Sequence, residues 1–286
     1  MGPPQKTGQR QAMRGQVKMG SLWDGLADTD RRVKLKTVSN CRDLGGIRTT
    51  EGAVIRRKYL YRSAAMRNVS KGDKEFLKDS CRLTEVIDLR TLRELEQMPD
   101  DLIEGIKYTP IPVFDDMRTG ISHEKEAEIL RGEGGIPPLE GMYRGIAMQK
   151  ESRQRLGAAL TAIMSHDFGD GSILWHCTEG KDRCGVLSAL VLLALSVDRK
   201  TVMEDYMLTN EVNVPKSEML YRHLIAEGRS MEVAVSVREA YQAKESYLQA
   251  FLDPMDEEYA EPVDFIREAL GVPGELILRF KGTVLA

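Results

Sequence analysis

Residues 172–185 read SILWHCTEGKDRCG, and an apolar run from Val186 to Val197 follows them. This order predicts a short strand, a tight polar loop and a buried helix. A loop at a helix N-terminus points several backbone N–H groups into one space and carries the positive end of the helix dipole. We therefore expect this loop to hold an anion such as phosphate.

Two side chains of the loop add chemistry to the anion site. Cys177 lies six positions before Arg183. A thiol at a helix N-terminus and near a cation loses its proton readily, and an arginine fork binds two phosphate oxygens at once. Gly180 allows a backbone conformation that a β-carbon would hinder. A thiolate, an anion cradle and a guanidinium together favour nucleophilic attack on phosphorus.

Two other kinds of site do not fit this loop. A Walker-type nucleotide loop needs Ser or Thr after its Gly-Lys pair and a Gly at its start, where this chain has Asp182 and Trp175. Cys177 and Cys184 lack the spacing of zinc ligands, and the sequence has no second Cys–His pair. We therefore expect no metal and no cofactor.

The composition sets wider limits. The chain has 286 residues, of which 42% are hydrophobic and 30% charged, with a net charge of −3. This balance gives no reason to expect a nucleic-acid partner, and four cysteines in so long a chain do not make a disulfide scaffold. The run 186–197 is too short to span a bilayer, which takes about 20 apolar residues. No secretory signal is visible, so we expect a cytoplasmic location; the oligomeric state is not indicated.

The chain divides into a short tail and one domain. Residues 1–20 contain basic and no acidic side chains, with several Gly, Pro and Gln, and predict a flexible basic tail. Residues 21–286 are expected to form a single domain, with the catalytic loop at 176–185 and C-terminal helices over 198–285. Because strands are expected in the first two thirds and helices afterwards, the pattern indicates an α/β domain with a helical cap.

Individual elements follow from local patterns. Strands are expected at 83–89, 106–113 and 172–175. Ser70 and Asp198 have the character of helix N-caps. The helix after Asp198 is expected to reach Asn213 and to be broken by Pro215. One further helix is expected over 231–252, and Asp253-Pro254 is expected to open the next.

The phosphate-binding stretch resembles the signature of the cysteine-based tyrosine and dual-specificity phosphatases. The ending Gly180-Lys181-Asp182-Arg183 is similar to the bacterial tyrosine-phosphatase-like branch, which acts on phosphotyrosine, other phosphoresidues and phosphoinositides. Other matching motifs follow in the order of that branch. They are NCRDLGG at 40–46, LYRS at 60–63, VIDLR at 86–90, DYMLTN at 205–210 and Tyr247-Leu248. The resemblance covers roughly residues 38–285.

The resemblance implies a central, mostly parallel sheet flanked by helices, and hydrolysis of phosphomonoesters through a phosphocysteine. It implies phosphorylated proteins or phosphoinositides as substrates and a general acid at Asp115. Asp116 and Asp182 stay open as alternatives for the acid. It further implies that His176 orients the loop and helps to set the thiol pKa, and that Lys181 adds a cation for polyanionic substrates. The expected phosphate-binding residues are Thr178, Glu179, Gly180, Lys181, Asp182 and Arg183.

One position departs from the family pattern. The residue after the loop arginine is usually Thr or Ser, whose hydroxyl assists the nucleophilic thiolate as it leaves, but here it is Cys184. A thiol is a weaker donor. Cys184 therefore leaves open a phospho-ligand binding protein without turnover, or an arsenate reductase or sulfurtransferase with Cys184 as resolving thiol.

Charged and thiol side chains outside the loop have plainer interpretations. Asp88 with Arg90, and Arg42 with Asp43, are interpreted as structural ion pairs. Cys41 and Cys81 are interpreted as inert core thiols.

Overall fold

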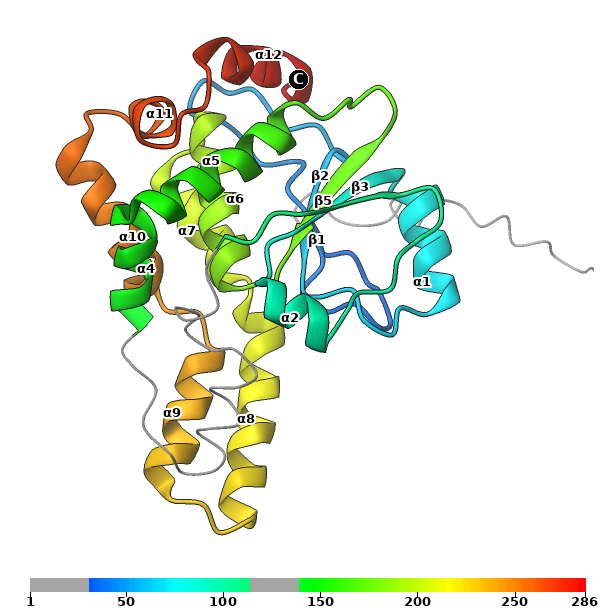
Figure 1. The fold of residues 1–286 in the computed structure, drawn as a ribbon, viewed down its shortest axis with the longest axis vertical. Coiled ribbons are helices and arrows are strands. Elements are labelled where there is room, and N and C mark those ends of the chain that lie inside the picture. The colour runs from blue at the N-terminus through cyan, green and yellow to red at the C-terminus, as the bar shows by residue number, and fades with distance from the viewer. Residues whose placement is uncertain (1–30, 114–138) are drawn as a thin grey trace, which may run out of the picture. The chain divides into compact units, whose positions relative to one another are not determined.

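A five-stranded sheet lies at the centre of the fold (Figure 1). The computed structural model describes residues 31–113 and 139–286. The strand order is β1-β2-β5-β3-β4, with β5 in the middle; β1 is antiparallel to β2 and the other neighbours are parallel. The strands are β1 (Arg42–Asp43), β2 (Leu60–Ser63), β3 (Leu83–Asp88), β4 (Lys107–Pro110) and β5 (Ser172–His176). The expected mostly parallel α/β architecture is confirmed.

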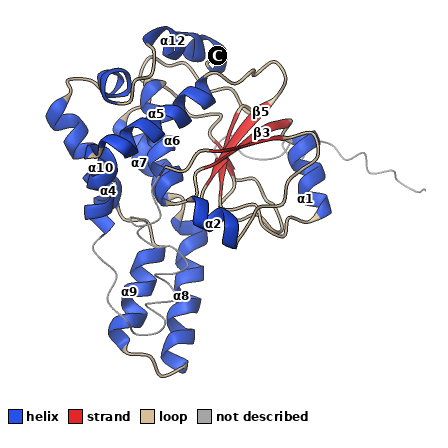
Figure 2. Ribbon diagram, in the orientation of Figure 1, coloured by secondary structure: helices blue, strands red, loops and turns tan. Residues whose placement is uncertain are grey.

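Helices flank this sheet, with α1 on one side and α5 and α6 on the other (Figures 1 and 2). Before the loop the helices are α1 (Lys71–Glu75) with the π-helical turn η1 (Phe76–Ser80), α2 (Leu92–Gln97), α4 (Leu139–Met148) and α5 (Lys150–Met164). After it come α6 (Asp182–Ala194), α7 (Arg199–Met207), α8 (Asn210–Ala226), α9 (Met231–Tyr241), α10 (Glu245–Glu258), α11 (Pro262–Asp264), η2 (Phe265–Ala269) and α12 (Gly274–Val284).

The core forms around β5 and α6. All residues of β5 are buried, and so is every residue of α6 from Arg183 to Ala194. A helix that is apolar on all sides belongs in the middle of a fold, because any exposed face would lose hydrophobic stabilisation. The strand and the helix that the sequence predicts around the loop therefore lie at the centre of the molecule.

Local signals at several element ends are confirmed. The Ser70 side chain accepts a hydrogen bond from the Asp73 backbone N–H and caps α1, and Asp198 caps α7 through the Thr201 N–H. The strands predicted at 83–89 and 172–175 are β3 and β5 within one residue at each end. The strand predicted over 106–113 is shorter, because β4 ends at Pro110.

The helix boundaries of the C-terminal part differ from the prediction. Pro215 and Pro254 lie inside α8 and α10 instead of ending or opening a helix. The helix expected over 231–252 is two helices, because the chain is extended at Gln242 and Lys244. Asn210 accepts from the Ala243 N–H at 2.8 Å and donates to the Ala243 carbonyl at 2.8 Å. These bonds hold the extended segment against the start of α8.

The predicted tail and the domain start at residue 21 lie outside the described residues, and the division of the chain there stays a prediction. Residues 31–113 and 139–286 belong to one compact unit. Within the part of the chain that the structure describes, no helix is long and apolar enough to cross a membrane.

Candidate active site

The anion loop lies between the end of β5 and the start of α6. We call residues 177–183 the phosphate loop. Gly180 adopts φ +65°, and a β-carbon there would lie 2.6 Å from the Ser63 carbonyl oxygen. A β-carbon does not fit at this distance, so the backbone conformation of the loop requires glycine at position 180. The helix dipole of α6 then points its positive end at the loop.

Cys177 lies at the floor of the loop and is 2% exposed. Burial alone would raise the pKa of its thiol. A hydrogen bond from the Cys184 thiol, the charge of Arg183 and the Cys184 backbone N–H together lower that pKa to about 6. At neutral pH Cys177 is therefore largely a thiolate, the form in which a cysteine attacks an electrophile.

Cys184 is fully buried in the first turn of α6. Its Sγ lies 3.7 Å from the Ser63 carbonyl oxygen and 3.8 Å from that of Trp175. Burial, followed by the neighbouring Cys177, raises the pKa of the Cys184 thiol well above its usual range. The two cysteines therefore differ in charge, with Cys184 as the protonated donor and Cys177 as the acceptor.

Arg183 forms a fork-to-fork ion pair with Glu94 of α2. The Nη1–Oε2 distance is 2.5 Å and the Nη2–Oε1 distance is 2.9 Å. Thr178 joins the pair: its Oγ1 donates to Glu94 Oε1 at 2.5 Å and accepts from Arg183 Nη2 at 3.1 Å. Burial opposes the charge of Glu94, but Arg183 lowers the pKa of the carboxyl to about 2. The bidentate contact fixes the plane of the guanidinium beside the thiolate.

The sequence interpretation missed Glu94, although a local signal for it exists. Thr91 and Glu94 form a capping box at the start of α2, the Ser/Thr-x-x-Glu pattern. This pattern predicts a helix start, but nothing in it points to Arg183, which lies 89 positions away.

His176 is wholly buried at the end of β5 and faces a charged cluster. Its Nε2 lies 2.8 Å from Asp100 Oδ2 and 3.6 Å from Asp88 Oδ2, while Nδ1 lies 3.2 Å from the Cys177 carbonyl oxygen. Burial lowers the pKa of His176, but Asp88 and Asp100 outweigh burial and raise it. An imidazole held by these contacts fixes the end of the strand from which the loop departs.

The predicted ion pair of Asp88 and Arg90 is present, at 2.6 Å. Arg90 also binds Asp100 at 2.8 Å. Among the described residues, Asp88, Asp100 and His176 form the one group whose donor atoms could surround a metal ion. The Arg90 guanidinium already pairs with both carboxylates, so the chain itself offsets part of their negative charge.

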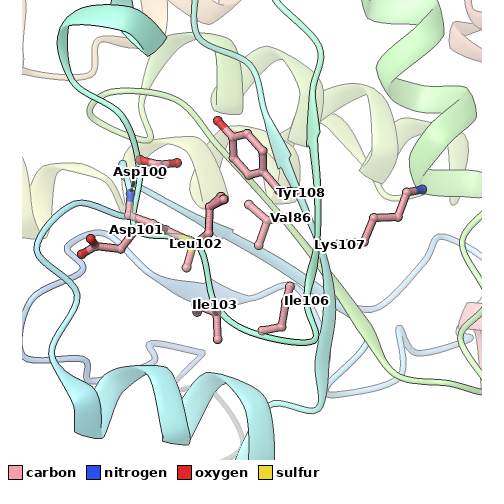
Figure 3. A pocket seen from close by; sticks show the side chains of 9 residues that line it. Val86, Asp100, Asp101, Leu102, Ile103, Ile106, Lys107 and Tyr108 are labelled. Carbon is pink, nitrogen blue, oxygen red and sulfur yellow. Dashed lines mark hydrogen bonds between the residues drawn. The ribbon is translucent and has the colours of Figure 1, made fainter.

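Asp100 borders a small pocket with largely apolar walls (Figure 3). The cavity measures about 10 Å³, which is room for about one water molecule. Figure 3 shows Leu102, Ile103 and Ile106 on its other sides. This pocket is therefore too small for a substrate.

Lys181 and Glu179 do not pair as opposing charges at the mouth of the loop. Lys181 is 1% exposed, and its Nζ donates to the carbonyl of Ala240 at the end of α9. The expected free cation at the mouth is thus covered by the end of α9 and by Gln242, whose carbonyl oxygen lies 3.4 Å from Nζ. Glu179 instead pairs with Lys216 of α8 at 2.7 Å.

Asp182, the first residue of α6, accepts a hydrogen bond of 2.6 Å from the Tyr143 hydroxyl on Oδ1. The Tyr143 hydroxyl also lies 2.8 Å from that of Tyr206. This contact ties the Asp182 side chain to α4. The role of Asp182, as an alternative general acid or as a substrate-binding residue, stays a prediction.

Asp115 and Asp116 lie outside the described residues. The described chain reaches Val113, whose N–H donates to the Leu89 carbonyl at 3.3 Å, just beyond the end of β3. The assignment of Asp115 as the general acid, with Asp116 as an alternative, stays a prediction.

Two further expectations concern residues 41–43 and 81. Arg42 pairs with Asp205, and Asp43 instead accepts from the Gly45 and Lys58 backbone N–H groups at 2.8 Å each; the expected pair of Arg42 with Asp43 is wrong. Cys41 and Cys81 are buried free thiols, and burial raises the pKa of both.

A cysteine with a lowered pKa in a loop before a buried helix, at the carboxyl edge of a mostly parallel sheet, is typical of the class of cysteine-dependent phosphatases. The chain belongs to the tyrosine phosphatase family, whose sequence profile matches residues 33–286.

The relatives agree with this family. The triple specificity protein phosphatase PtpB of Mycobacterium tuberculosis is 25% identical over 256 residues, covering 79% of this chain and 90% of PtpB. A protein of Cupriavidus necator, provisionally named a tyrosine-protein phosphatase, is 26% identical over 260 residues and 87% of each chain. Among solved structures, the catalytic core of the PP-IP phosphatase SIW14 from S. cerevisiae has a TM-score of 0.31 at 17% identity, covering 52% of this chain and 70% of that one.

Proposed function

We propose that this chain hydrolyses phosphomonoesters through a phosphocysteine formed on Cys177. The observation that carries the proposal is the buried Cys177 thiol with a pKa of about 6, in a loop that also presents Arg183. The thiolate attacks phosphorus in line with the leaving oxygen, forming the S–P bond as the P–O bond breaks. Arg183 and the backbone N–H groups of residues 178–183 stabilise the charge that develops on the equatorial oxygens.

The leaving oxygen takes a proton from a general acid, for which Asp115 is the first candidate and Asp116 and Asp182 are the alternatives. Water then attacks the phosphocysteine and gives a proton to the same residue, which now acts as a base, while the S–P bond breaks and its electron pair returns to Cys177. The Cys184 thiol donates to Cys177 and stabilises it as it leaves. No step requires a metal ion or cofactor.

The substrates proposed are phosphorylated proteins, on Tyr, Ser or Thr, or phosphoinositides. The name of PtpB, a triple specificity protein phosphatase, supports a broad range. Assays with a phosphotyrosine peptide, a phosphoserine peptide and phosphoinositide vesicles would rank these classes by kcat/KM. A wide lead for one class would define the physiological substrate type.

The first test is hydrolysis of para-nitrophenyl phosphate with a chelator and a reductant present, comparing wild type with Cys177→Ser. We expect wild-type activity to survive the chelator and the variant to lose it. Activity that the variant retains would overturn the role of Cys177. A wild type that binds phosphate analogues without turnover would indicate a binding protein, and thiol-dependent reduction of arsenate would indicate a reductase.

A further inference from the structure

Two consecutive carbonyl groups of the phosphate loop are held from behind by side chains outside it. The Glu179 carbonyl accepts from Asn40 Nδ2 at 3.0 Å. The Gly180 carbonyl accepts from the same nitrogen at 3.1 Å and from Arg62 Nη2 at 2.8 Å. Neither Asn40 nor Arg62 is among the residues expected to bind phosphate. Asn40 precedes β1, and Arg62 lies in β2.

The direction of a carbonyl fixes the direction of the N–H that follows it. In a trans peptide the C=O and N–H groups point opposite ways. Holding the Glu179 carbonyl toward Asn40 therefore turns the Gly180 N–H the other way, and holding the Gly180 carbonyl does the same for Lys181. These two N–H groups belong to the set proposed to bind phosphate.

Asn40 and Arg62 are themselves fixed by buried charges. Arg42 Nη1 donates to Asn40 Oδ1 at 2.6 Å, which leaves the amide nitrogen of Asn40 facing the loop. Asp205 accepts from Arg42 Nε at 3.2 Å and from Arg62 Nη1 at 3.0 Å. The side chains of Arg42, Arg62 and Asp205 are each no more than 2% exposed.

Among the described residues, the charges of this cluster do not cancel. Arg31 also pairs with Asp205, at 2.7 Å, so three guanidinium groups surround one carboxylate. Burial, and after it the repulsion from Arg62, lowers the pKa of Arg42 to about 10 against the opposing pull of Asp205. Positive charge in a poorly solvated place attracts an anion more strongly than the same charge in water.

We propose that Asn40 and Arg62 are positioning residues that aim the Gly180 and Lys181 N–H groups at the phosphate, with the Arg31–Arg42–Asp205 cluster as their support. The inference rests on the proposed use of the loop as the phosphate site. Because the two side chains act through the loop backbone, their loss should weaken binding of any tetrahedral oxyanion and of the transition state together.

The test uses Asn40→Gly with Asn68→Gly as its matched control. Both asparagines adopt left-handed backbone, with φ of 53° and 52°, so glycine fits either site without strain; Asn68 is exposed. We would measure tungstate affinity by calorimetry, kcat/KM with para-nitrophenyl phosphate, and the thermal midpoint. Asn40→Gly should weaken tungstate binding and kcat/KM each by about tenfold, less than the loss of a direct oxyanion donor, and Asn68→Gly should change neither.

A second variant separates charge from geometry. Arg62→Lys keeps a positive charge but cannot reach Asp205 and the Gly180 carbonyl as one planar fork. We expect it to weaken tungstate binding as Asn40→Gly does. The proposal is overturned if either variant lowers the thermal midpoint alone, if kcat/KM falls at unchanged tungstate affinity, or if the wild type does not bind tungstate. Weakened tungstate binding in a chain without turnover would support the proposal and contradict the proposed function instead.

Discussion

The Cys177 thiol has a low pKa although it is buried, so its reactivity should increase as the thiolate forms. The thiolate forms as the pH rises through about 6. We predict that the rate of alkylation by iodoacetamide rises through this pH and then levels off. The value of kcat/KM should rise through the same pH and fall where the general acid loses its proton. Cys81→Ser should leave both profiles unchanged, because burial raises the pKa of that thiol to about 12. An alkylation midpoint near the ordinary value of 9.0 would contradict the prediction.

Cys184 donates to the leaving thiolate with a thiol where a hydroxyl would donate better. We predict that Cys184→Thr raises the steady-state rate, since a stronger donor speeds hydrolysis of the phosphocysteine. Cys184→Ala, which has no donor at all, should lower the same rate. Comparing the initial burst of product with the steady-state rate shows whether hydrolysis of the phosphocysteine is the step that changes. A slower Cys184→Thr enzyme would show that the thiol is not what limits turnover.

At the scale of elements, α2 supplies the partner of Arg183. Breaking a buried ion pair on one side leaves an uncompensated charge and typically costs about 3–5 kcal/mol. We therefore predict that Glu94→Ala lowers the free energy of unfolding by about that amount, as measured in urea. Glu96→Ala, at an exposed position of the same helix, should change it by less than about 0.5 kcal/mol. Equal effects of the two substitutions would contradict the stabilising role of the buried pair of Glu94 with Arg183.

Local sequence patterns predict the ends of some helices correctly but not those of others. The caps at Ser70 and Asp198 depend on atoms three residues apart, so the sequence shows them directly. The end of α9 depends on Asn210 and Asn213, which bind the backbone of residues 241–243 from about 30 positions away. Hydrophobic periodicity carries no trace of such contacts. Pro254 is buried inside α10, where packing outweighs the local preference against proline, which is about 3 kcal/mol in a helix interior.

At the scale of the whole molecule, several buried carboxylates have lowered pKa values. Burial opposes each shift, but Arg183 lowers the pKa of Glu94, and His166, Lys107 and Thr109 lower that of Glu85, both to about 2. Asp88 and Asp205 are shifted in the same direction by His176 and by the surrounding arginines. Such groups stabilise the fold above their ordinary pKa values of 3.8 to 4.5 and lose that contribution as the pH falls toward about 2.

His176 contributes with the opposite sign. Its raised pKa stabilises the fold below its ordinary value of 6.5, and that contribution is lost as the pH rises through the raised value. We predict that the thermal midpoint falls steeply in acid, from about pH 4 downward, and declines gently above neutrality. Calorimetric scans over this range provide the check. A midpoint that stays constant into strong acid would contradict the assignment of these carboxylates.

The sequence predicts the site residues that lie close together along the chain, but not those that only the fold brings together. Cys177, Gly180 and Arg183 lie within seven residues, and their spacing alone carries the chemistry. Glu94 and Asn40 contact the loop, and Asp100 contacts His176 just before it, across 76 to 140 positions of sequence, so only the fold reveals them. Asp115 depends on residues that the structure does not describe, and its role stays a prediction.

The buried guanidinium cluster behind the loop has a consequence for ionic strength. Mobile ions screen surface charges over a Debye length of about 8 Å in physiological salt, but they do not enter a packed interior. Arg42 and Arg62 are covered by protein on all sides. Their attraction for a dianion should therefore persist in concentrated salt, where enzymes that gather phosphorylated substrates with surface lysines lose affinity.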